Sequence, residues 1–226
     1  MDALHKGLDS EKIKTLELAL DQQIAKRFKF RINGFYNTID DIITHRPATA
    51  SELLIIDPSG AITSTLVYDN LGQQTIYGFE AEIFGYPTEK IHFWGNISYK
   101  EGQFKTTSPI SGVDTTLNYI PFMEKITANI GATLRFGNFS ISPYYQFVGK
   151  REGYLGNAVN NIQSVDSYGL INLNIIYKVS NNTLVSILGK NLTNETYYYP
   201  EEARREILTI PGGPGIGIFA KLTFKL

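Results

Sequence analysis

The sequence contains no cysteine among its 226 residues, which excludes a disulfide framework and a thiolate metal site. It also has no run that approaches the ~18 apolar residues of a transmembrane helix, and its mean hydropathy is −0.13. The first residues, MDALHKGLDSEK, lack the apolar segment of a signal peptide. Helical periodicity is scarce, and only the short stretch at 200–206 suggests a helix.

The chain also has little net charge and few groups suited to catalysis. Its 21 Lys and Arg residues nearly balance 22 Asp and Glu residues, so nucleic acid is not an expected partner. The histidines His5, His45 and His92 lack the spacing of metal ligands, and no serine lies in a nucleophile motif. Glu80 and Glu82 share one face of a predicted strand, where hydration explains them better than acid–base chemistry. We therefore expect no catalytic residue, no metal site and no cofactor, and the protein is not expected to be an enzyme.

Aromatic residues in strand-like alternation are abundant instead. The chain has 14 Tyr, 13 Phe and 20 Gly but only 9 Pro, a composition that suits an all-β protein. Apolar and polar residues alternate with a period of two in many segments. The stretch 183–191 fits less well, because it places apolar residues on both faces, but it is still interpreted as a strand. Together with the final FAKLTFKL, the pattern predicts about nine strands, at 14–21, 27–36, 76–85, 90–100, 124–137, 138–149, 169–178, 183–191 and 216–226.

Short and long connections alternate between these strands. That rhythm predicts an antiparallel up-and-down sheet, with tight turns at one end and long loops at the other, as in outer-membrane barrels. The short connections are expected near 22–26, 86–90, 137–138 and 180–182, and the long ones near 45–72, 105–118, 151–165 and 193–214.

The two faces of the predicted strands differ in composition. One face is rich in Asn, Ser, Gly and mixed charge, which suits a wet lumen, whereas the other is apolar with aromatic residues near the strand ends. This favours a transmembrane β-barrel over a soluble β-barrel that binds a lipophile, although the latter also alternates. Because single-chain barrels have an even strand number, nine or ten strands fit either a small barrel or an incomplete piece of a larger one. The aromatic residues in question are Phe28, Tyr36, Tyr99, Phe136, Phe139, Phe147 and Tyr177.

Several segments contain motifs that one protein family shows in the same order. The residues that carry these motifs are Asn33, Phe35, Tyr36, Ile39, Asp41, Ile43, Asn70, Gly72, Gly78, Glu80, Glu82, Pro121, Lys125, Asn191, Leu192, Asn194 and Tyr197. Together with the entry GLDSEKIKTLELAL they extend over nearly the whole chain and resemble the C-terminal part of a TonB-dependent outer-membrane receptor. In that entry, Ser10 and Ala19 stand where Pro and Gly are usual. Two further departures are Ile216, where Arg is frequent, and Leu226, where Phe or Trp is usual.

The resemblance implies that residues 1–226 are the C-terminal part of the barrel domain of such a receptor. They would be the last strands of a 22-strand barrel, without the plug domain and the signal peptide. It also implies a location in the outer membrane and active transport of an iron–siderophore, a cobalamin or a similar scarce nutrient. The implied partners are outer-membrane lipid, the missing N-terminal barrel and plug, the barrel-assembly machinery, and TonB through the plug. The alternatives are a small porin-like or adhesin-like barrel and the soluble lipophile-binding barrel.

Substrate contacts are expected in the long loops, because loops on a rigid scaffold usually carry recognition. The loop segments 150–157 and 197–206 combine aromatic residues with Arg and Glu, which can stack on and pair with an anionic metal chelate. An interfacial aromatic belt and solvated arginines are the simpler explanation of the same residues. The substrate-binding candidates are Arg151, Tyr154, Arg204 and Arg205.

Overall fold

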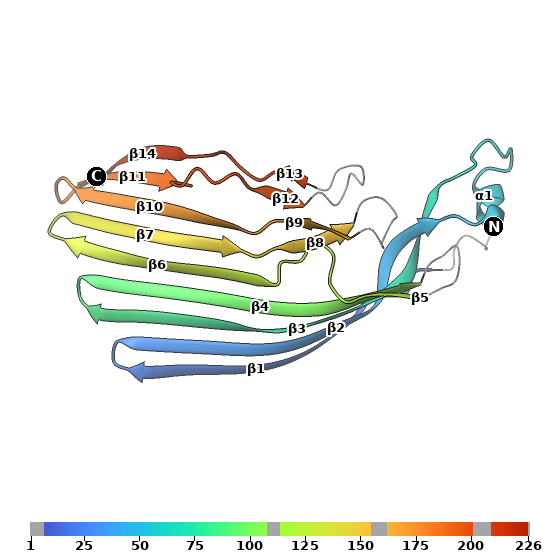
Figure 1. Cartoon of the computed structure of the whole chain (residues 1–226), viewed down its shortest axis with the longest axis horizontal. Helices are drawn as coiled ribbons and strands as arrows, with labels where there is room; N and C mark the ends of the chain where they lie inside the picture. The colour runs from blue at the N-terminus through green and yellow to red at the C-terminus, as the bar shows by residue number, and fades with distance from the viewer. Residues whose placement is uncertain (1–6, 108–113, 155–161, 201–208, 226) are drawn as a thin grey trace. The chain divides into compact units, whose positions relative to one another are not determined.

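A computed structural model describes residues 7–107, 114–154, 162–200 and 209–225 of the chain (Figure 1). The predicted helix at 200–206 falls outside these residues except for Pro200, and so do Arg204 and Arg205. The described part is built almost entirely of strands, and its one helix is α1 (Ala50–Ile56). The strands are β1 (Lys12–Ala25), β2 (Phe28–Pro47), β3 (Leu66–Thr88), β4 (Ile91–Thr107), β5 (Asp114–Leu117), β6 (Ile126–Phe136), β7 (Phe139–Val148), β8 (Arg151–Tyr154), β9 (Ile162–Val165), β10 (Tyr168–Lys178), β11 (Thr183–Lys190), β12 (Tyr198–Pro200), β13 (Thr209–Pro211) and β14 (Gly217–Phe224).

The main sheet follows the order of the sequence. Its strands are hydrogen-bonded in the order β1-β2-β3-β4-β6-β7-β10-β11-β14, with β5 paired to β4, and the registered pairs are antiparallel. The nine strands of this path confirm the predicted up-and-down sheet and its strand count. The order begins at β1 and ends at β14, so these two are the edge strands of the sheet in the described chain, which is therefore not closed into a barrel.

The tight turns lie close to their predicted positions. Two residues join β1 to β2, two join β3 to β4, and Gly137 and Asn138 join β6 to β7. Gly137 has φ +56°, a left-handed conformation that glycine adopts without the cost of a Cβ clash. The prediction for the first turn was wrong by a few residues, because β1 continues to Ala25. Figure 1 shows the β6–β7 and β10–β11 turns at one end and the β8–β9 and β12–β13 hairpins at the other.

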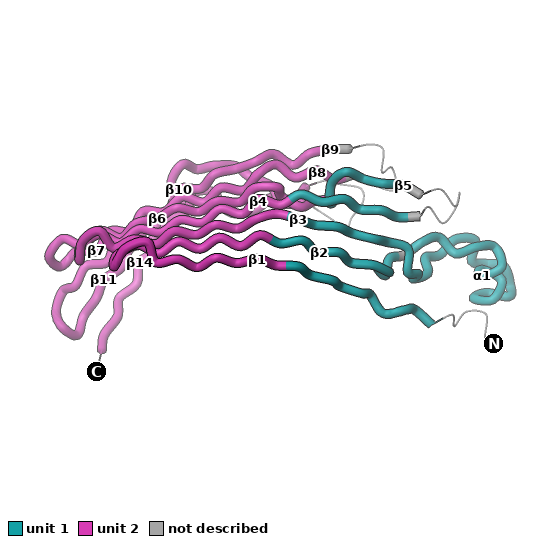
Figure 2. Tube along the Cα trace, turned by 90° about the horizontal axis from the view of Figure 1, so that it is seen from below, with its two compact units in different colours: residues 1–16, 35–77, 101–120 teal, residues 17–34, 78–100, 121–226 magenta. Residues whose placement is uncertain are grey.

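The chain divides into two compact units (Figure 2). Unit 1 contains residues 1–16, 35–77 and 101–120, and unit 2 contains residues 17–34, 78–100 and 121–226. Strands β1 to β4 contribute residues to both units, whereas β6 to β14 belong to unit 2. We describe each unit by itself.

In unit 2, one face of the sheet is apolar along whole cross-strand rows. One such row runs Ile91, Leu134, Ile141, Ile175, Ile187, Ala220 across six strands. Side chains on this face are exposed: Ile130 keeps 61% of its surface accessible, Ile218 71% and Phe224 64%. We call this side the apolar face. Such a face must be covered by lipid or protein, because exposed apolar surface of this extent is unfavourable in water.

Aromatic residues lie at the short-turn end of the apolar face. Phe136 opposes Phe139 in the β6–β7 register, and the Phe139 ring lies 4.6 Å from the Tyr177 ring, centroid to centroid. Tyr99 and Tyr36, predicted to lie near strand ends, lie well inside β4 and β2 instead, because both strands extend further toward the long loops than the alternation indicated.

The opposite face of unit 2 carries hydrogen-bonded polar rows, and we call it the polar face. Asn129 Nδ2 donates to Asn96 Oδ1 at 2.9 Å, and the hydroxyls of Thr133 and Ser142 lie 3.0 Å apart. These contacts join neighbouring strands in the same manner as the backbone ladder. A polar face of this kind suits a water-filled interior.

Unit 1 contains a structured loop between β2 and β3, where the sequence predicted only an irregular connection at 45–72. Helix α1 begins after Thr49, whose hydroxyl accepts a hydrogen bond from the Glu52 amide while the Glu52 carboxylate accepts one from the Thr49 amide. This reciprocal capping box satisfies two amides that would otherwise lack partners. The loop predicted at 105–118 is also more ordered than expected, because β5 pairs there with the end of β4.

Each unit buries few apolar side chains among its described residues. Leu117 and Tyr119 are buried in unit 1, and Val165, Tyr168 and Leu170 in unit 2. A soluble β-barrel would bury the side chains of one complete face. No helix among the described residues is long and apolar enough to cross a membrane.

Candidate functional site

At the long-loop end of unit 2, an arginine and several tyrosines that could contact a ligand pack against one another. The hairpins β8–β9 and β12–β13 occupy the loops that the sequence predicted as irregular at 151–165 and 193–214. Arg151 begins β8, where it opposes Val165 of β9 and forms a bridge with Glu124. The hairpin thus positions Arg151 at the end of the polar face. There, one cross-strand row runs through Ser98, Thr127, Val148 and Tyr168.

Arg151 is buried, with 4% of its surface exposed. Its guanidinium carbon lies 5.5 Å from the centroid of the Tyr168 ring, and Nη2 donates a hydrogen bond to the Tyr198 carbonyl at 3.0 Å. Nε is buried without a hydrogen-bond partner among the described residues. A planar guanidinium suits this site because it stacks on an aromatic ring and donates in the same plane. Arg151 therefore joins β8, β10 and β12.

Three tyrosines extend this contact toward the β11–β14 loop. The Tyr168 and Tyr197 rings lie 4.4 Å apart, and the Tyr197 and Tyr199 rings meet edge to face at 5.7 Å. Tyr168 is buried, whereas Tyr199 keeps 41% of its surface exposed. Together with Arg151 they form what we call the tyrosine–arginine cluster. The exposed Tyr199 ring can stack on a planar ligand, and its hydroxyl can donate to such a ligand.

An ion pair lies beside the cluster. Lys100 Nζ lies 2.8 Å from Glu124 Oε1, and the two side chains are each about three-quarters buried. Because Glu124 also pairs with Arg151 through the backbone bridge, the end of β4 is tied to β8. The ion pair therefore neutralises the charge of Lys100 and stabilises the link between β4 and β8.

Asparagine residues fix the segment that leads to the tyrosines. Asn191 is buried with φ 49°; its side chain donates to the Glu195 carbonyl at 2.8 Å and accepts from the Glu195 amide at 2.8 Å. Asn194, with φ 54°, accepts a hydrogen bond from the Ile216 amide. Asparagine tolerates the left-handed conformation and caps its own turn. These contacts explain why asparagine suits both ends of the NLTN segment at 191–194.

The structure places the predicted site residues differently. Arg151 lies inside the cluster, where direct ligand contact would require Tyr198 or Tyr168 to move. Tyr154 ends β8, and Arg204 and Arg205 lie outside the described residues. Sequence reasoning weighed the aromatic residues of 197–206 either as ligand contacts or as an interfacial belt and did not single out Tyr168, whose position facing Arg151 depends on the register of β10. Within the described ranges, no group of three or more His, Asp or Glu side chains could hold a metal ion.

The comparison with known proteins decides the family. Residues 3–192 match the family described as TonB dependent receptor-like, beta-barrel. The chain belongs to the TonB-dependent receptors. It is therefore a β-barrel segment of an outer-membrane protein, in a family of receptors that depend on TonB. No curated protein sequence matches it.

Solved structures agree with this fold. The siderophore receptor PiuA from Acinetobacter baumannii has a TM-score of 0.73 at 18% identity, and 99% of this chain covers 30% of it. The FrpB iron transporter from Neisseria meningitidis has a TM-score of 0.71 at 16% identity, with 96% and 32% covered. The copper transporter OprC has a TM-score of 0.69 at 20% identity, with 97% and 32% covered. The chain spans about a third of the length of these TonB-dependent structures.

Proposed function

We propose that this chain is the C-terminal part of the barrel of a TonB-dependent active transporter for an iron–siderophore, a cobalamin or a similar scarce nutrient. The observation that carries the proposal is the pair of opposite faces in unit 2. The exposed apolar face meets the hydrocarbon of the outer membrane, and the hydrogen-bonded polar face lines the interior. Both arise from one alternating sequence pattern and an antiparallel register that keeps like residues in rows.

The chain contributes wall, outer loops and the closing strand β14 in this proposal. Its edge strands β1 and β14 present backbone donors and acceptors that are costly to leave unpaired in lipid. The remaining strands of the receptor satisfy them, and the barrel-assembly machinery is the partner that brings the edges together. Transport then consists of tight binding outside followed by movement of the plug driven through TonB. The chain carries out no covalent chemistry.

The ligand specificity comes from the loops at the long-loop end. The names of the solved relatives mention siderophores, iron and copper, which supports a metal or its chelate as the substrate class. Tyr199 is exposed and precedes residues 201–208 in the sequence, which include Arg204 and Arg205. We assign ligand contact to these two arginines and to Tyr154, with Arg151 holding the tyrosines in place.

The test uses the full-length receptor in cells that have or lack TonB. We expect uptake of a radiolabelled ferric siderophore to require TonB, and Arg204→Ala with Arg205→Ala to weaken ligand binding. Lys90→Ala, in the exposed turn between β3 and β4, is the matched control that removes a positive charge elsewhere. Uptake that is independent of TonB would instead support a porin-like barrel. Unchanged affinity in the double variant would remove the arginines from the site but leave the transport proposal in place.

A further inference from the structure

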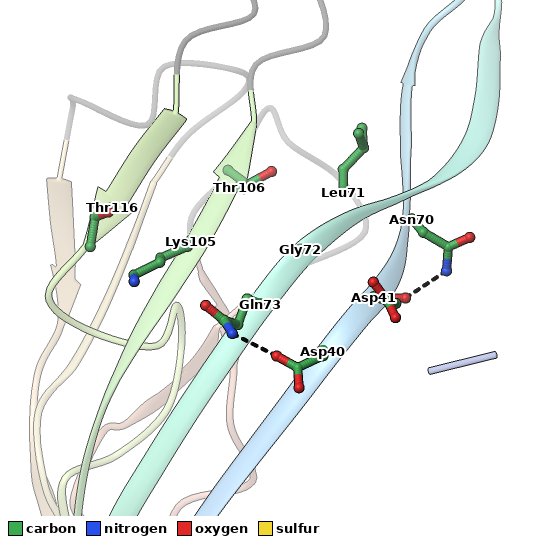
Figure 3. Close-up of a pocket in the computed structure, with 9 residues that line it drawn as sticks. All are labelled: Asp40, Asp41, Asn70, Leu71, Gly72, Gln73, Lys105, Thr106 and Thr116. Carbon is green, nitrogen blue, oxygen red and sulfur yellow. Dashed lines mark hydrogen bonds between the residues drawn. The ribbon is translucent and has the colours of Figure 1, made fainter. Parts of the chain in front are cut away.

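Unit 1 contains a polar pocket of about 450 Å³ (Figure 3). It lies on β2, β3, β4 and β5, and its volume falls in the usual range for small-molecule sites. Leu71 is the only large apolar residue among those that line it; the others are Asp40, Asp41, Asn70, Gly72, Gln73, Lys105, Thr106 and Thr116. All of these residues belong to unit 1.

The backbone of β2 departs from regular strand geometry at the pocket. Asp41 has φ 60°, which a non-glycine residue adopts rarely and an aspartate more readily than most. In a regular strand, consecutive side chains point to opposite faces. The left-handed residue interrupts that alternation, so both Asp40 and Asp41 line the same pocket. Asn70 stabilises this conformation, because its Nδ2 donates to the Asp41 carbonyl at 2.6 Å (Figure 3). The same Nδ2 also donates to the Asp9 carbonyl at 2.9 Å.

The acceptors of the pocket are held in place but retain capacity. Gln73 Nε2 donates to Asp40 Oδ1 at 2.6 Å (Figure 3), and Lys12 Nζ lies 2.8 Å from Asp41 Oδ2. Each carboxylate oxygen can accept a second hydrogen bond, and Gln73 retains its amide oxygen and one N–H. The surrounding amide and ammonium groups therefore orient the two carboxylates without using all of their lone pairs.

The hydrogen-bond donors on the other side of the pocket are Lys105, Thr106 and Thr116, and no described residue engages them. Lys105 of β4 lies directly opposite Thr116 of β5 in the antiparallel register. No hydrogen bond or ion pair to another described residue engages the Lys105 ammonium or the hydroxyls of Thr106 and Thr116. Within the described part of the chain, the pocket thus offers fixed acceptors from β2 and, from β4 and β5, donors that no described residue engages.

From this arrangement we propose that the pocket binds a sugar. Hydroxyl groups on adjacent carbons both donate and accept, and they match carboxylates, a carboxamide, threonine hydroxyls and one ammonium. Lys12 and Lys14 pair with Asp41 and Asp40, and Lys105 is the lysine that lines the pocket, so the charges around it nearly balance and do not select a strongly charged ligand. An apolar peptide is disfavoured because only Leu71 offers it a contact. The sugar comes either from solution or from the headgroup of a glycolipid in the outer leaflet.

Binding to the whole chain in detergent tests the site with two probes. The first is the free core oligosaccharide released from lipopolysaccharide, and the second is a vesicle that contains intact lipopolysaccharide. We expect Lys105→Ala and Thr116→Val each to weaken binding of a probe by about five- to tenfold, the range for losing one hydrogen bond. Both residues are exposed, so neither variant should affect folding. Lys90→Ala removes a lysine from an exposed turn and serves as the control.

The two probes separate the sources of the sugar. Binding of the free oligosaccharide that both pocket variants weaken supports a soluble sugar ligand. Binding of the vesicle alone, weakened by the same variants, supports a glycolipid headgroup. If neither probe binds, or if the pocket variants bind as the Lys90→Ala control does, the proposal is wrong.

Discussion

The loop between β2 and β3 should lose its order in acid because one glutamate holds it together. Arg46 Nη2 lies 2.7 Å from Glu52 Oε1 and Nη1 donates to Oε2 at 2.8 Å, while Arg46 Nε lies 2.8 Å from Asp69 Oδ2. This paired contact with Arg46, followed by the hydrogen bond from the Thr49 amide, lowers the pKa of Glu52 from 4.5 to about 2. The Arg46 pKa is raised in turn, so the pair stays ionised.

The magnitude follows from that pKa. A fall from 4.5 to about 2 sets an upper limit of about 3 kcal/mol on the stabilisation of the closed loop. Because the Glu52 side chain keeps 21% of its surface exposed, solvent screening reduces this to about 1–2 kcal/mol. The folded-state pKa lies below the unfolded one, so the contribution is complete above pH 4.5 and is lost as the pH falls through about 2.

Hydrogen exchange measures this loss at named amides. The Ala48 amide donates to Thr65 and the Asp57 amide to Leu53, so both report on loop closure. We expect their protection factors at pH 6 to fall about 5- to 30-fold in Glu52→Gln, and to become nearly independent of pH between 5 and 2.5 in that variant. Glu89→Gln, in an exposed turn, is the charge-matched control. Protection in the unmodified chain that stays constant down to pH 2.5 would refute the reasoning.

Three further predictions concern two glycines whose neighbours leave no room for a Cβ and one asparagine with a positive φ. Gly131→Ala places a Cβ 2.8 Å from the Trp94 ring, so we expect shifted fluorescence from the chain's only tryptophan and a loss of about 1–3 kcal/mol in urea unfolding. Gly78→Ala brings the Cβ against the Tyr99 carbonyl oxygen, and because backbone cannot move aside, it should destabilise more than Gly131→Ala in the same assay. Asn191→Ala should cost about 2–3 kcal/mol, and Asn191→Gly about 1 kcal/mol less because it relieves the positive φ; equal losses would contradict the backbone argument.

The strands and turns were predictable because they depend on local alternation. The weakest prediction, 183–191, is confirmed as β11. Its mixed pattern has a structural cause: Leu188 lies in register with Asn174 and Phe219 on the polar face, and Lys190 Nζ lies 5.7 Å from the Phe219 ring. A local apolar contact on the polar face cannot be distinguished by periodicity from a strand buried on both sides.

The candidate sites were less accessible to sequence reasoning. Arg151 was identified by residue type, but its burial against Tyr168 depends on the pairing of β7 with β10. The pocket of unit 1 depends on the left-handed Asp41 and on the pairing of β4 with β5. Such juxtapositions arise from register and from single backbone angles, which composition and spacing do not encode. Helix α1 was missed because seven residues give too little periodicity to recognise.

The sequential strand order affects how the sheet and its loops can evolve. Every long connection begins on one strand and ends on its immediate neighbour in the sheet, as between β7 and β10 or between β11 and β14. The distance that a loop must span is therefore fixed and small, whatever its length, and each doubling of loop length adds only about 0.6 kcal/mol to the entropy of closure. Insertions, deletions or whole replacement hairpins can be exchanged at one end without altering the registered pairs between consecutive strands of the main path. Recognition can diversify there while the rest of the wall remains as it is.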